Sequence, residues 1–253
     1  MKNIRSEVLA GKTLLGTWLN LGSSITAEIC GLAGFDWVCL DLEHGAGDQE
    51  SLVHQLQALE HTPAAPLVRV AWNDAPRIKR ALDLGPSGCI IPYVSSEEEA
   101  RAAVQGMRYP PEGVRGVAKM NRAARFGQTF DAYFREANES LLTVVQIETE
   151  AAVNAAEAIA AVEGVDVLFI GPLDLSTNLG VMGHYEHPRF LEALSRVEAA
   201  AERAGKAMGI LMTEAEALPR FIEKGYQLLA LGSDGGMVAA GARRILEALR
   251  QSA

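Results

Sequence analysis

The sequence has 253 residues, of which 49% are hydrophobic and 22% are charged. This length and composition predict one large globular domain over residues 1–253, with an ample hydrophobic core. The formal net charge of −9 and the pI near 5.1 argue against nucleic acid as a partner, because phosphate binding requires clustered lysine and arginine side chains.

The hydropathy of the chain predicts neither secretion nor membrane insertion. The first residues, MKNIRSEVLAGK, lack the long apolar stretch of a signal peptide, and no run approaches the 18 or so apolar residues of a transmembrane helix. Cys30, Cys39 and Cys89 each lie in an apolar neighbourhood, so we interpret them as small core residues in a reducing compartment. We therefore expect a cytoplasmic protein without a membrane partner.

Strand and helix patterns alternate along the chain. Short apolar runs with β-branched residues predict buried strands at 14–21, 36–42, 66–71, 88–94, 141–147, 165–170, 207–212 and 227–232. The segments between them predict helices at 24–33, 48–61, 74–84, 95–106, 149–162, 188–204, 214–224 and 237–251. Eight strand–helix units in about 250 residues predict an α/β fold, a (β/α)8 TIM barrel.

A doubly wound open sheet is the alternative architecture. It is disfavoured because no Gly-x-Gly-x-x-Gly follows the first predicted strand, and for the same reason we expect no NAD. One connection, residues 107–140, is unusually long and contains Arg108, Arg115, Arg122 and Arg125. Such a loop is equally compatible with a surface excursion and with an active-site or subunit contact.

Two apolar runs near the middle of the chain each lead to a carboxylate. The run 141–147 precedes Glu148, and the run 167–173 precedes Asp174. In a barrel the C-terminal ends of the strands share one rim, where the active site lies. Two neighbouring carboxylates there either bind a metal ion or share a proton, because two bare negative charges repel each other.

A histidine comes directly after the second predicted strand. His44 lies beside Asp41, Glu43 and Gly45, whereas the other four histidines fall in helix or loop patterns. An acidic neighbour orients an imidazole and raises its basicity. We therefore expect a catalytic or ligand role for His44, with Asp41 as one candidate acidic partner.

Arg69 lies inside the apolar strand Leu67-Val68-Arg69-Val70. A buried arginine is unfavourable unless it meets an anion. It could form an ion pair with an acid inside the barrel, or it could bind a substrate carboxylate or a developing enolate. We favour the second interpretation.

Other residues also lie at the predicted rim. The backbone of Gly171-Pro172-Leu173 could offer N–H donors just before Asp174, although Pro172 itself has none, and Ser176 could cap a structural element after it. Trp18, Gln146 and Leu211 complete this set. Asp83, by contrast, ends a predicted helix, and the residues alone suggest a surface acid.

Taken together, these residues resemble the metal-dependent (class II) pyruvate aldolases of the HpcH/HpaI family, which includes 4-hydroxy-2-oxoheptanedioate, 2-dehydro-3-deoxyglucarate and 2-keto-3-deoxyrhamnonate aldolases. The resemblance runs nearly end to end, and the paired Gln-x-Glu-Thr and Gly-Pro-x-Asp-Leu-Ser motifs are specific when found together. It rests on the segments 34–37, 41–44, 68–70, 72–74, 108–111, 113–116, 146–149, 162–166, 171–176 and 209–211.

The resemblance implies an aldehyde-lyase on a phosphoenolpyruvate/pyruvate-type barrel. It would reversibly cleave a 4-hydroxy-2-oxo acid into pyruvate and an aldehyde through a metal-bound pyruvate enolate. Glu148 and Asp174 would hold the divalent cation, Mg2+, Mn2+ or Co2+. Hard oxygen ligands suit these ions. Gln146 and the backbone around Leu173 would position the substrate.

The resemblance also implies the acid–base groups and the assembly. His44 would be the base, acting directly or through a metal-bound water, and Arg69 would stabilise the enolate. The family pairs this histidine with an acid at the position of Asp83 across a subunit boundary, which replaces our surface interpretation and leaves Asp41 as a second possible partner. A homohexamer, a dimer of trimers, would form with the C-terminal helix packed on or swapped with a neighbour.

The departures from the family pattern concern the second substrate. Leu173 stands where several relatives have alanine, and residues 233–236 look more like the sugar-acid branch than the heptanedioate branch. The sequence does not choose the aldehyde, its stereochemistry or the preferred metal.

Three alternatives remain. A Schiff-base aldolase would need a lysine facing the pocket from a strand, and no lysine is predicted there, so we expect neither a Schiff-base lysine nor PLP. A related lyase, such as a citramalyl- or malyl-CoA lyase or a phosphoenolpyruvate mutase, would share the Mg2+ and the acids, although no basic cluster for CoA phosphates is evident. A non-catalytic sugar-acid binder would need neither His44 nor the metal ligands.

Overall fold

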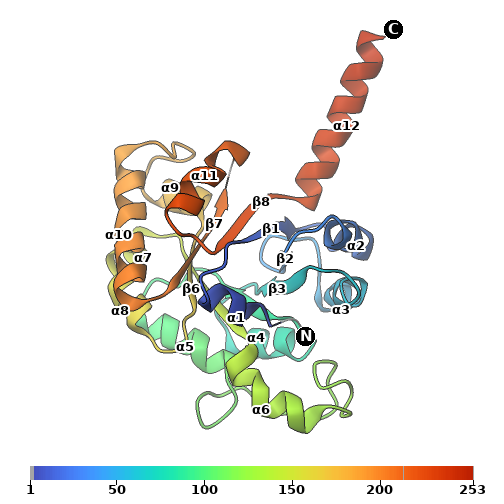
Figure 1. Cartoon of the computed structure of the whole chain (residues 1–253), viewed down its shortest axis with the longest axis vertical. Coiled ribbons are helices and arrows are strands. Elements are labelled where there is room, and N and C mark those ends of the chain that lie inside the picture. Colours follow the sequence, from blue (N-terminus) through green and yellow to red (C-terminus); the bar gives the residue numbers. More distant parts are fainter. Residues whose placement is uncertain (1–2, 213, 253) are drawn as a thin grey trace.

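The computed structural model describes residues 3–212 and 214–252, and these residues confirm the (β/α)8 barrel. Their strands are parallel, follow one another around the barrel in chain order, and close between the last and the first (Figure 1). The strands are β1 (Leu14–Leu19), β2 (Trp37–Asp41), β3 (Ala65–Arg69), β4 (Gly88–Ile91), β5 (Leu142–Ile147), β6 (Val167–Ile170), β7 (Ala207–Met212) and β8 (Leu228–Ser233). Each strand either lies inside its predicted range or differs from that range by at most two residues at either end.

Helices alternate with the strands, and most of them cover the outside of the barrel (Figure 1). They are α1 (Ile4–Leu9), α2 (Ser24–Leu32), α3 (Gln49–Ala58), α4 (Ala75–Leu82), α5 (Glu97–Met107), α6 (Phe130–Ser140), α7 (Glu150–Asn154), α8 (Ala156–Ala161), α9 (Pro172–Asn178), α10 (Pro188–Ala204), the 3-10 turn η1 (Ala215–Ala217), α11 (Leu218–Glu223) and α12 (Asp234–Gln251). Among the described residues, no helix is long and apolar enough to cross a membrane.

Large side chains fill the barrel interior. The rings of Trp18 and Trp37 meet edge to face with their centroids 5.7 Å apart, and Phe169 lies 5.5 Å from Trp18. Gly16 makes room for this cluster, because a Cβ there would come within 2.3 Å of the Trp37 ring. The barrel is therefore a packed core whose chemistry is confined to its open end.

Helix α1, which the sequence analysis did not predict, closes the N-terminal end of the barrel. Its Ile4 and Val8 side chains join the apolar cluster inside the barrel. Arg5 reaches Asp166 with two hydrogen bonds of 2.9 and 3.0 Å. A six-residue helix carries too little periodicity to be recognised from sequence.

Two connections contain helices that were not predicted. The long 107–140 connection is an excursion, residues 108–129, followed by α6. Helix α9 begins at Pro172, with Gly171 as its N-cap. The suggestion that Ser176 caps a later element was therefore wrong, because Ser176 lies inside α9 and donates its hydroxyl to the Leu173 carbonyl at 2.9 Å.

Helix α12 extends away from the barrel as a long arm (Figure 1). Its first residue, Asp234, is buried and accepts hydrogen bonds from the backbone of Asn20 at 2.8 Å and from the Thr26 hydroxyl at 2.6 Å. The rest of the described helix lacks buried residues. The helix is thus anchored to the barrel at its start and carries exposed apolar side chains beyond it.

Candidate active site

The predicted site residues, apart from Asp83, gather at the C-terminal rim of the barrel. Asp41 ends β2 and pairs in register with Arg69, which ends β3. Gln146 lies near the end of β5, Glu148 follows that strand directly, and Gly171 follows β6. Since the strands are parallel, these positions lie on the same side of the barrel.

Arg69 holds two acids from the end of β2 and the turn after it. Its Nε and Nη2 atoms donate to the two Asp41 oxygens at 2.9 and 2.7 Å, and its Nη1 lies 2.9 Å from Oε2 of Glu43. The guanidinium carbon lies 5.6 Å from the centre of the Trp18 ring. Burial lowers the pKa of Arg69, but its acidic partners outweigh this effect and hold the pKa above its ordinary value.

The first of our two interpretations of Arg69, an ion pair with acids inside the barrel, is therefore present. Each guanidinium nitrogen already has an acidic partner, so a substrate anion would share the guanidinium with Asp41 and Glu43. Asp41 is also occupied: its Oδ1 accepts the backbone N–H groups of Glu43 at 3.0 Å and His44 at 3.3 Å. Asp41 thus shapes the turn that carries His44.

Glu148 is a deeply buried acid of the rim, at 1% exposure. Its Oε1 accepts the backbone N–H of Tyr93 at 2.7 Å, and its Oε2 accepts Nε2 of Gln146 at 3.0 Å. Burial raises the pKa of Glu148 to about 7, and the negative charges of Glu43 and Asp174 add to this effect. The site thus holds a carboxyl that binds its proton more tightly than an exposed glutamate does.

Gly171 gives Glu148 its space. A Cβ at this glycine would lie 2.4 Å from Oε2 of Glu148 and 3.4 Å from Nε2 of Gln146. Pro172 is buried beside it, and Leu173 points outward with half of its surface exposed. The Gly-Pro pair therefore has a packing role here in addition to starting α9.

Asp174 lies in the first turn of α9 and is partly exposed. Burial raises the pKa of the Tyr93 phenol, and the charges of Asp174, Glu148 and Glu43 raise it further. The charges of Glu43 and Asp174 also raise the pKa of Glu148, and the charge of Asp174 raises that of Glu43, so the three acids form one electrostatic cluster. We call Glu43, Glu148 and Asp174 the acid cluster.

His44 lies exposed at the turn after β2. Within the described part of the chain its imidazole makes no hydrogen bond, and neither Asp41 nor Asp83 contacts it. Burial raises the pKa of Glu43, whereas Arg69 and His44 oppose this shift, so the imidazole lies near the Glu43 carboxyl. The structure brings His44 to the rim beside the acid cluster.

Asp83 does not lie at this rim. It is the C-cap of α4, and helices of the barrel run antiparallel to their strands, so its carboxylate lies at the N-terminal end. Its Oδ1 accepts hydrogen bonds from Arg115 at 2.9 Å and from Asn121 at 3.2 Å. Asp83 therefore cannot form a hydrogen bond with His44 of the same chain.

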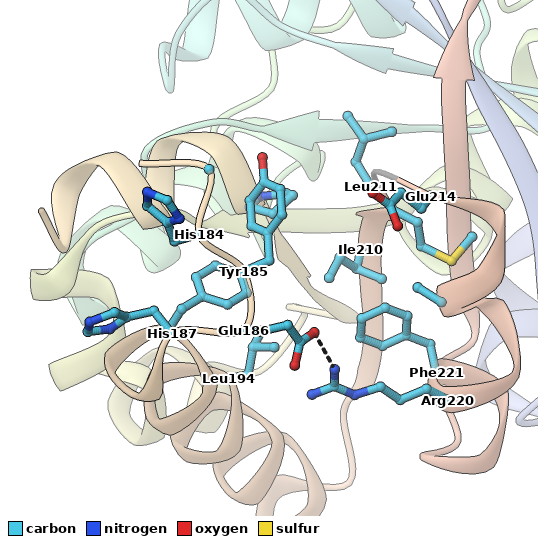
Figure 2. A pocket seen from close by; sticks show the side chains of 15 residues that line it. His184, Tyr185, Glu186, His187, Leu194, Ile210, Leu211, Glu214, Arg220 and Phe221 are labelled. Carbon is cyan, nitrogen blue, oxygen red and sulfur yellow. Dashed lines mark hydrogen bonds and ion pairs between the residues drawn. The ribbon is translucent and has the colours of Figure 1, made fainter. Parts of the chain in front are cut away.

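A cavity of about 500 Å³, here called the β7 pocket, adjoins the rim at Pro172 and Leu211. Figure 2 shows His184 and Tyr185 on one side, from the connection between α9 and α10, and Leu211 and Phe221 on the other. An ion pair of 3.1 Å between Glu186 and Arg220 joins the two sides (Figure 2). The pocket is therefore lined by both apolar and polar side chains.

The donor set at the rim fits a hard divalent cation. Among the described residues, no three His, Cys, Asp or Glu side chains form a ready-made metal cage. Mg2+, however, is commonly held by one or two carboxylates, with waters and substrate oxygens completing the shell. Glu148 and Asp174 supply such carboxylates, and the buried Gln146 Oε1 and Trp18 Nε1 atoms have no hydrogen-bond partner in the described structure.

The lysines that the structure describes lie away from this rim. Lys206 precedes β7 at the N-terminal end, where it donates to the Val162 carbonyl at 3.3 Å, and burial lowers its pKa. Lys12 likewise precedes β1, and Lys79 lies on α4. This arrangement gives no support to a Schiff-base mechanism, which needs a lysine in the pocket.

Three features of the site were not predicted. The contact of Glu43 with Arg69, the backbone donor of Tyr93 and the β7 pocket all depend on how different strands meet. Glu43 could have been found, since it lies just after a strand that ends on Asp41. The other two carry no signal in a single sequence.

Comparisons with known proteins identify the family of this chain. Residues 14–240 match the HpcH/HpaI aldolase/citrate lyase family. A 5-keto-4-deoxy-D-glucarate aldolase from Salmonella arizonae is 42% identical over 242 residues, which are 96% of this chain and 94% of that protein. The Salmonella paratyphi C protein of the same name is 41% identical over 98% of this chain and 96% of its own length.

A solved structure shows the same architecture throughout. It is an HpcH/HpaI aldolase/citrate lyase family protein from Burkholderia cenocepacia J2315, and it superposes with a TM-score of 0.93 at 37% identity, covering 99% of this chain and 100% of that one. The match of both sequence and fold spans the acid cluster and its supporting strands. The chain therefore belongs to the HpcH/HpaI aldolase/citrate lyase family and is an enzyme of the aldehyde-lyase class.

Proposed function

We propose that this enzyme reversibly cleaves a 4-hydroxy-2-oxo acid into pyruvate and an aldehyde, with the enolate of pyruvate as its intermediate. The observation that carries the proposal is the acid cluster at the rim, in which burial raises the pKa of Glu148 to about 7 beside Asp174 and Glu43. Negative charges that lie this close repel one another, and a cation between the carboxylates would relieve this repulsion.

Glu148 and Asp174 would hold this cation, Mg2+, Mn2+ or Co2+. When bound, the ion would polarise the ketone oxygen of the substrate and stabilise the negative charge that develops there. Gln146 already orients Glu148 through its Nε2, which leaves its Oε1 free to bind another group. Gln146 and the backbone of Gly171 and Leu173 would position the 2-oxo acid.

His44 would move the proton. In the cleavage direction it takes the proton of the 4-hydroxyl, the bond between C3 and C4 breaks, and the aldehyde leaves. The enolate then accepts a proton at C3 and becomes pyruvate. Arg69 would stabilise the negative charge of the enolate, because its acidic partners keep the guanidinium charged.

The substrate class would be that of the sugar acids. The Salmonella relatives are named for 5-keto-4-deoxy-D-glucarate, which agrees with the sugar-acid character of residues 233–236. The β7 pocket adjoins Leu211 and carries hydroxyl, imidazole and charged groups. We propose that the hydroxylated tail of the substrate extends toward this pocket, with Leu173 limiting its width.

We further propose a homohexamer built as a dimer of trimers. Helix α12 exposes Ile245, Leu246 and Leu249 by 62, 48 and 64%, and it projects away from its own barrel (Figure 1). A helix with this much exposed apolar surface needs a covering partner. In such an assembly Asp83 would reach the histidine at position 44 of a neighbouring subunit, as the family resemblance implies.

A panel assay tests the substrate class. Purified enzyme is incubated with pyruvate, Mg2+ and aldehydes that carry a hydroxyl and a carboxylate, or with apolar aldehydes of the same length, and products are followed by NMR. We expect products with the hydroxylated, acidic aldehydes and none in EDTA. Turnover of CoA esters alone would favour the citramalyl- or malyl-CoA lyase alternative, and binding without turnover would favour the non-catalytic binder.

A further inference from the structure

The proposed chemistry leaves one buried charge without a role. Arg115, in the excursion, is 1% exposed. The rings of Tyr109 and Tyr133 flank it, with their centroids 4.4 and 5.5 Å from the guanidinium carbon. Its Nη2 donates to Oδ1 of Asp83 at 2.9 Å and to the Tyr133 hydroxyl at 3.0 Å.

This guanidinium is buried at considerable cost. Its Nε and Nη1 atoms have no hydrogen-bond partner among the described residues, and its ion pair in the described structure is with Asp83. Burial lowers the pKa of Arg115, but the two tyrosines and Asp83 outweigh this effect, so the group is held charged. An incompletely paired buried charge is unfavourable unless the contact that it does make is needed.

The contact with Asp83 is one-sided. Both donors, Arg115 Nη2 and Asn121 Nδ2, bind Oδ1, at 2.9 and 3.2 Å. In the described structure Oδ2 receives no donor, and the Asp83 side chain is 22% exposed while that of Arg115 is 0% exposed. One oxygen is therefore fixed from inside the protein, and the other is left for a donor from outside.

The excursion does not depend on Arg115 for its attachment to the end of α4. The backbone N–H of Ala123 donates to the Asp83 carbonyl at 3.0 Å, and Nη1 of Arg122 donates to the Leu84 carbonyl at 2.7 Å. These bonds place the main chain. The guanidinium of Arg115, by contrast, binds the side-chain carboxylate of Asp83.

We propose that Arg115 is a positioning residue that holds the Asp83 carboxylate in one orientation, so that Oδ2 accepts an N–H from His44 of the partner subunit. This inference rests on the proposed function, in which Asp83 orients the histidine of a neighbour. Arg115 touches neither the substrate nor the reacting atoms. Its effect passes through Asp83 alone.

A subunit-mixing experiment tests this pathway. Chains with two different affinity tags are co-expressed, and assemblies that carry both tags are purified. Exchange of the pyruvate methyl protons is then measured with Mg2+. Arg115→Met mixed with His44→Asn should recover activity well above either variant alone, because His44 of the first chain meets an intact Asp83 of the second.

The matched mixture should fail. A mixture of Arg115→Met chains with Asp83→Asn chains should show no recovery, because both kinds of chain then carry their defect on the Asp83 side of the contact. Recovery in this mixture would overturn the inference. So would a lack of recovery with His44→Asn in conditions where Asp83→Asn and His44→Asn do complement each other.

A double-mutant cycle provides the second readout. Arg115→Met should slow proton exchange about 10-fold or more with little change in the KM for pyruvate, and Asp83→Asn should slow it by about 100-fold. The double variant should be no slower than Asp83→Asn, because residues that act as a unit are not additive. A rate equal to the product of the two separate losses would show a merely structural role and overturn the inference.

Controls separate this inference from the proposed function. Arg108→Met removes another arginine of the excursion, paired with Glu112 at 3.2 Å, and should leave the rate unchanged. If Arg115→Met does not assemble, Tyr133→Phe replaces it in the cycle, since it removes only the hydroxyl that holds Nη2. A wild-type rate for Tyr133→Phe in that case would overturn the inference, and a wild-type rate for Asp83→Asn would overturn the proposed role of Asp83 with it.

Discussion

The Oε1 atom of Glu148 lies 2.7 Å from the backbone nitrogen of Tyr93, whose φ angle is 55°. A left-handed backbone conformation is unfavourable for a tyrosine by about 1–2 kcal/mol. Strain of this kind concentrates at functional sites, where the surrounding structure enforces it. Here the conformation directs the backbone N–H of Tyr93 toward the buried carboxylate of Glu148. This hydrogen bond opposes the rise in the pKa of Glu148.

The pH dependence of stability should reveal the Glu148 carboxyl. Burial raises its pKa to about 7, above the unfolded value of about 4.3, so the folded state binds this proton more tightly. The contribution of Glu148 to stability is therefore complete below pH ~4.3 and is lost as the pH rises through about 7. Without metal, wild type should lose stability relative to Glu148→Gln between about pH 5.5 and about pH 8.5.

Urea unfolding with EDTA at the two pH values measures this difference. The glutamine variant is the matched control, because its amide has the same shape and does not titrate. A wild-type stability that tracks the variant at both pH values would show that Glu148 is not proton-linked. Added Mg2+ should restore the wild type at the higher pH and leave the variant unchanged.

Gly171→Ala should disturb the same carboxyl from the opposite side. The new Cβ would lie 2.4 Å from Glu148 Oε2, so the side chain must move away. Overpacking of this kind costs about 1–3 kcal/mol, and the displaced carboxylate should bind Mn2+ at least about 10-fold more weakly. Equilibrium dialysis with Mn2+ measures this change directly. Gly241→Ala, on α12 with open space around it, is the control and should bind Mn2+ as wild type does.

Removing Arg69 should destabilise the fold as well as the reaction. Arg69→Met leaves Asp41 and Glu43 without their shared partner in a buried setting, where a broken ion pair costs about 3–5 kcal/mol. Chemical denaturation should show this loss together with a large fall in turnover. Arg101→Met removes an exposed arginine paired with Glu97 on α5 and should cost about 0–1 kcal/mol. Equal stabilities of the two variants would mean that the Arg69 pairs contribute little.

The arm formed by α12 should control assembly. Leu249→Glu places a charge on its exposed apolar side, since Leu249 is 64% exposed in one chain. Light scattering after gel filtration should show a hexamer for wild type and smaller species for this variant. Arg243→Gln, on the same helix, should leave the mass unchanged. A hexamer that survives Leu249→Glu, or a wild type that is monomeric, would contradict the proposed role of α12.

The barrel could be predicted because each strand carries its own signal. Runs such as 141–147 and 165–170 are short, apolar and rich in β-branched residues, and their regular spacing with helices leaves few folds to consider. Helices α1, α6 and α9 escaped prediction. Helices α1 and α9 have only six and seven residues, and α6 lies within a connection that also contains irregular backbone. Length and spacing, rather than propensity, decided which elements could be found.

The site could be predicted as a set of residues, but not as a set of contacts. Glu148 and Arg69 could be recognised from their place at the ends of apolar strands, where a charged group needs a reason. The pairing of Arg69 with Glu43, and of Arg115 with Asp83, joins residues from separate elements across long stretches of chain. Such contacts arise only when the barrel closes, so a single sequence does not contain them.

The exchange of the methyl protons of pyruvate tests the central claim most directly. Pyruvate in D2O is followed by proton NMR with wild type and with Glu148→Gln, each with Mg2+ or with EDTA. The proposed mechanism predicts rapid loss of the methyl signal only for wild type with Mg2+, because enolate formation needs both the cation and the carboxylates that hold it. Exchange at the wild-type rate in EDTA, or by Glu148→Gln, would contradict the mechanism.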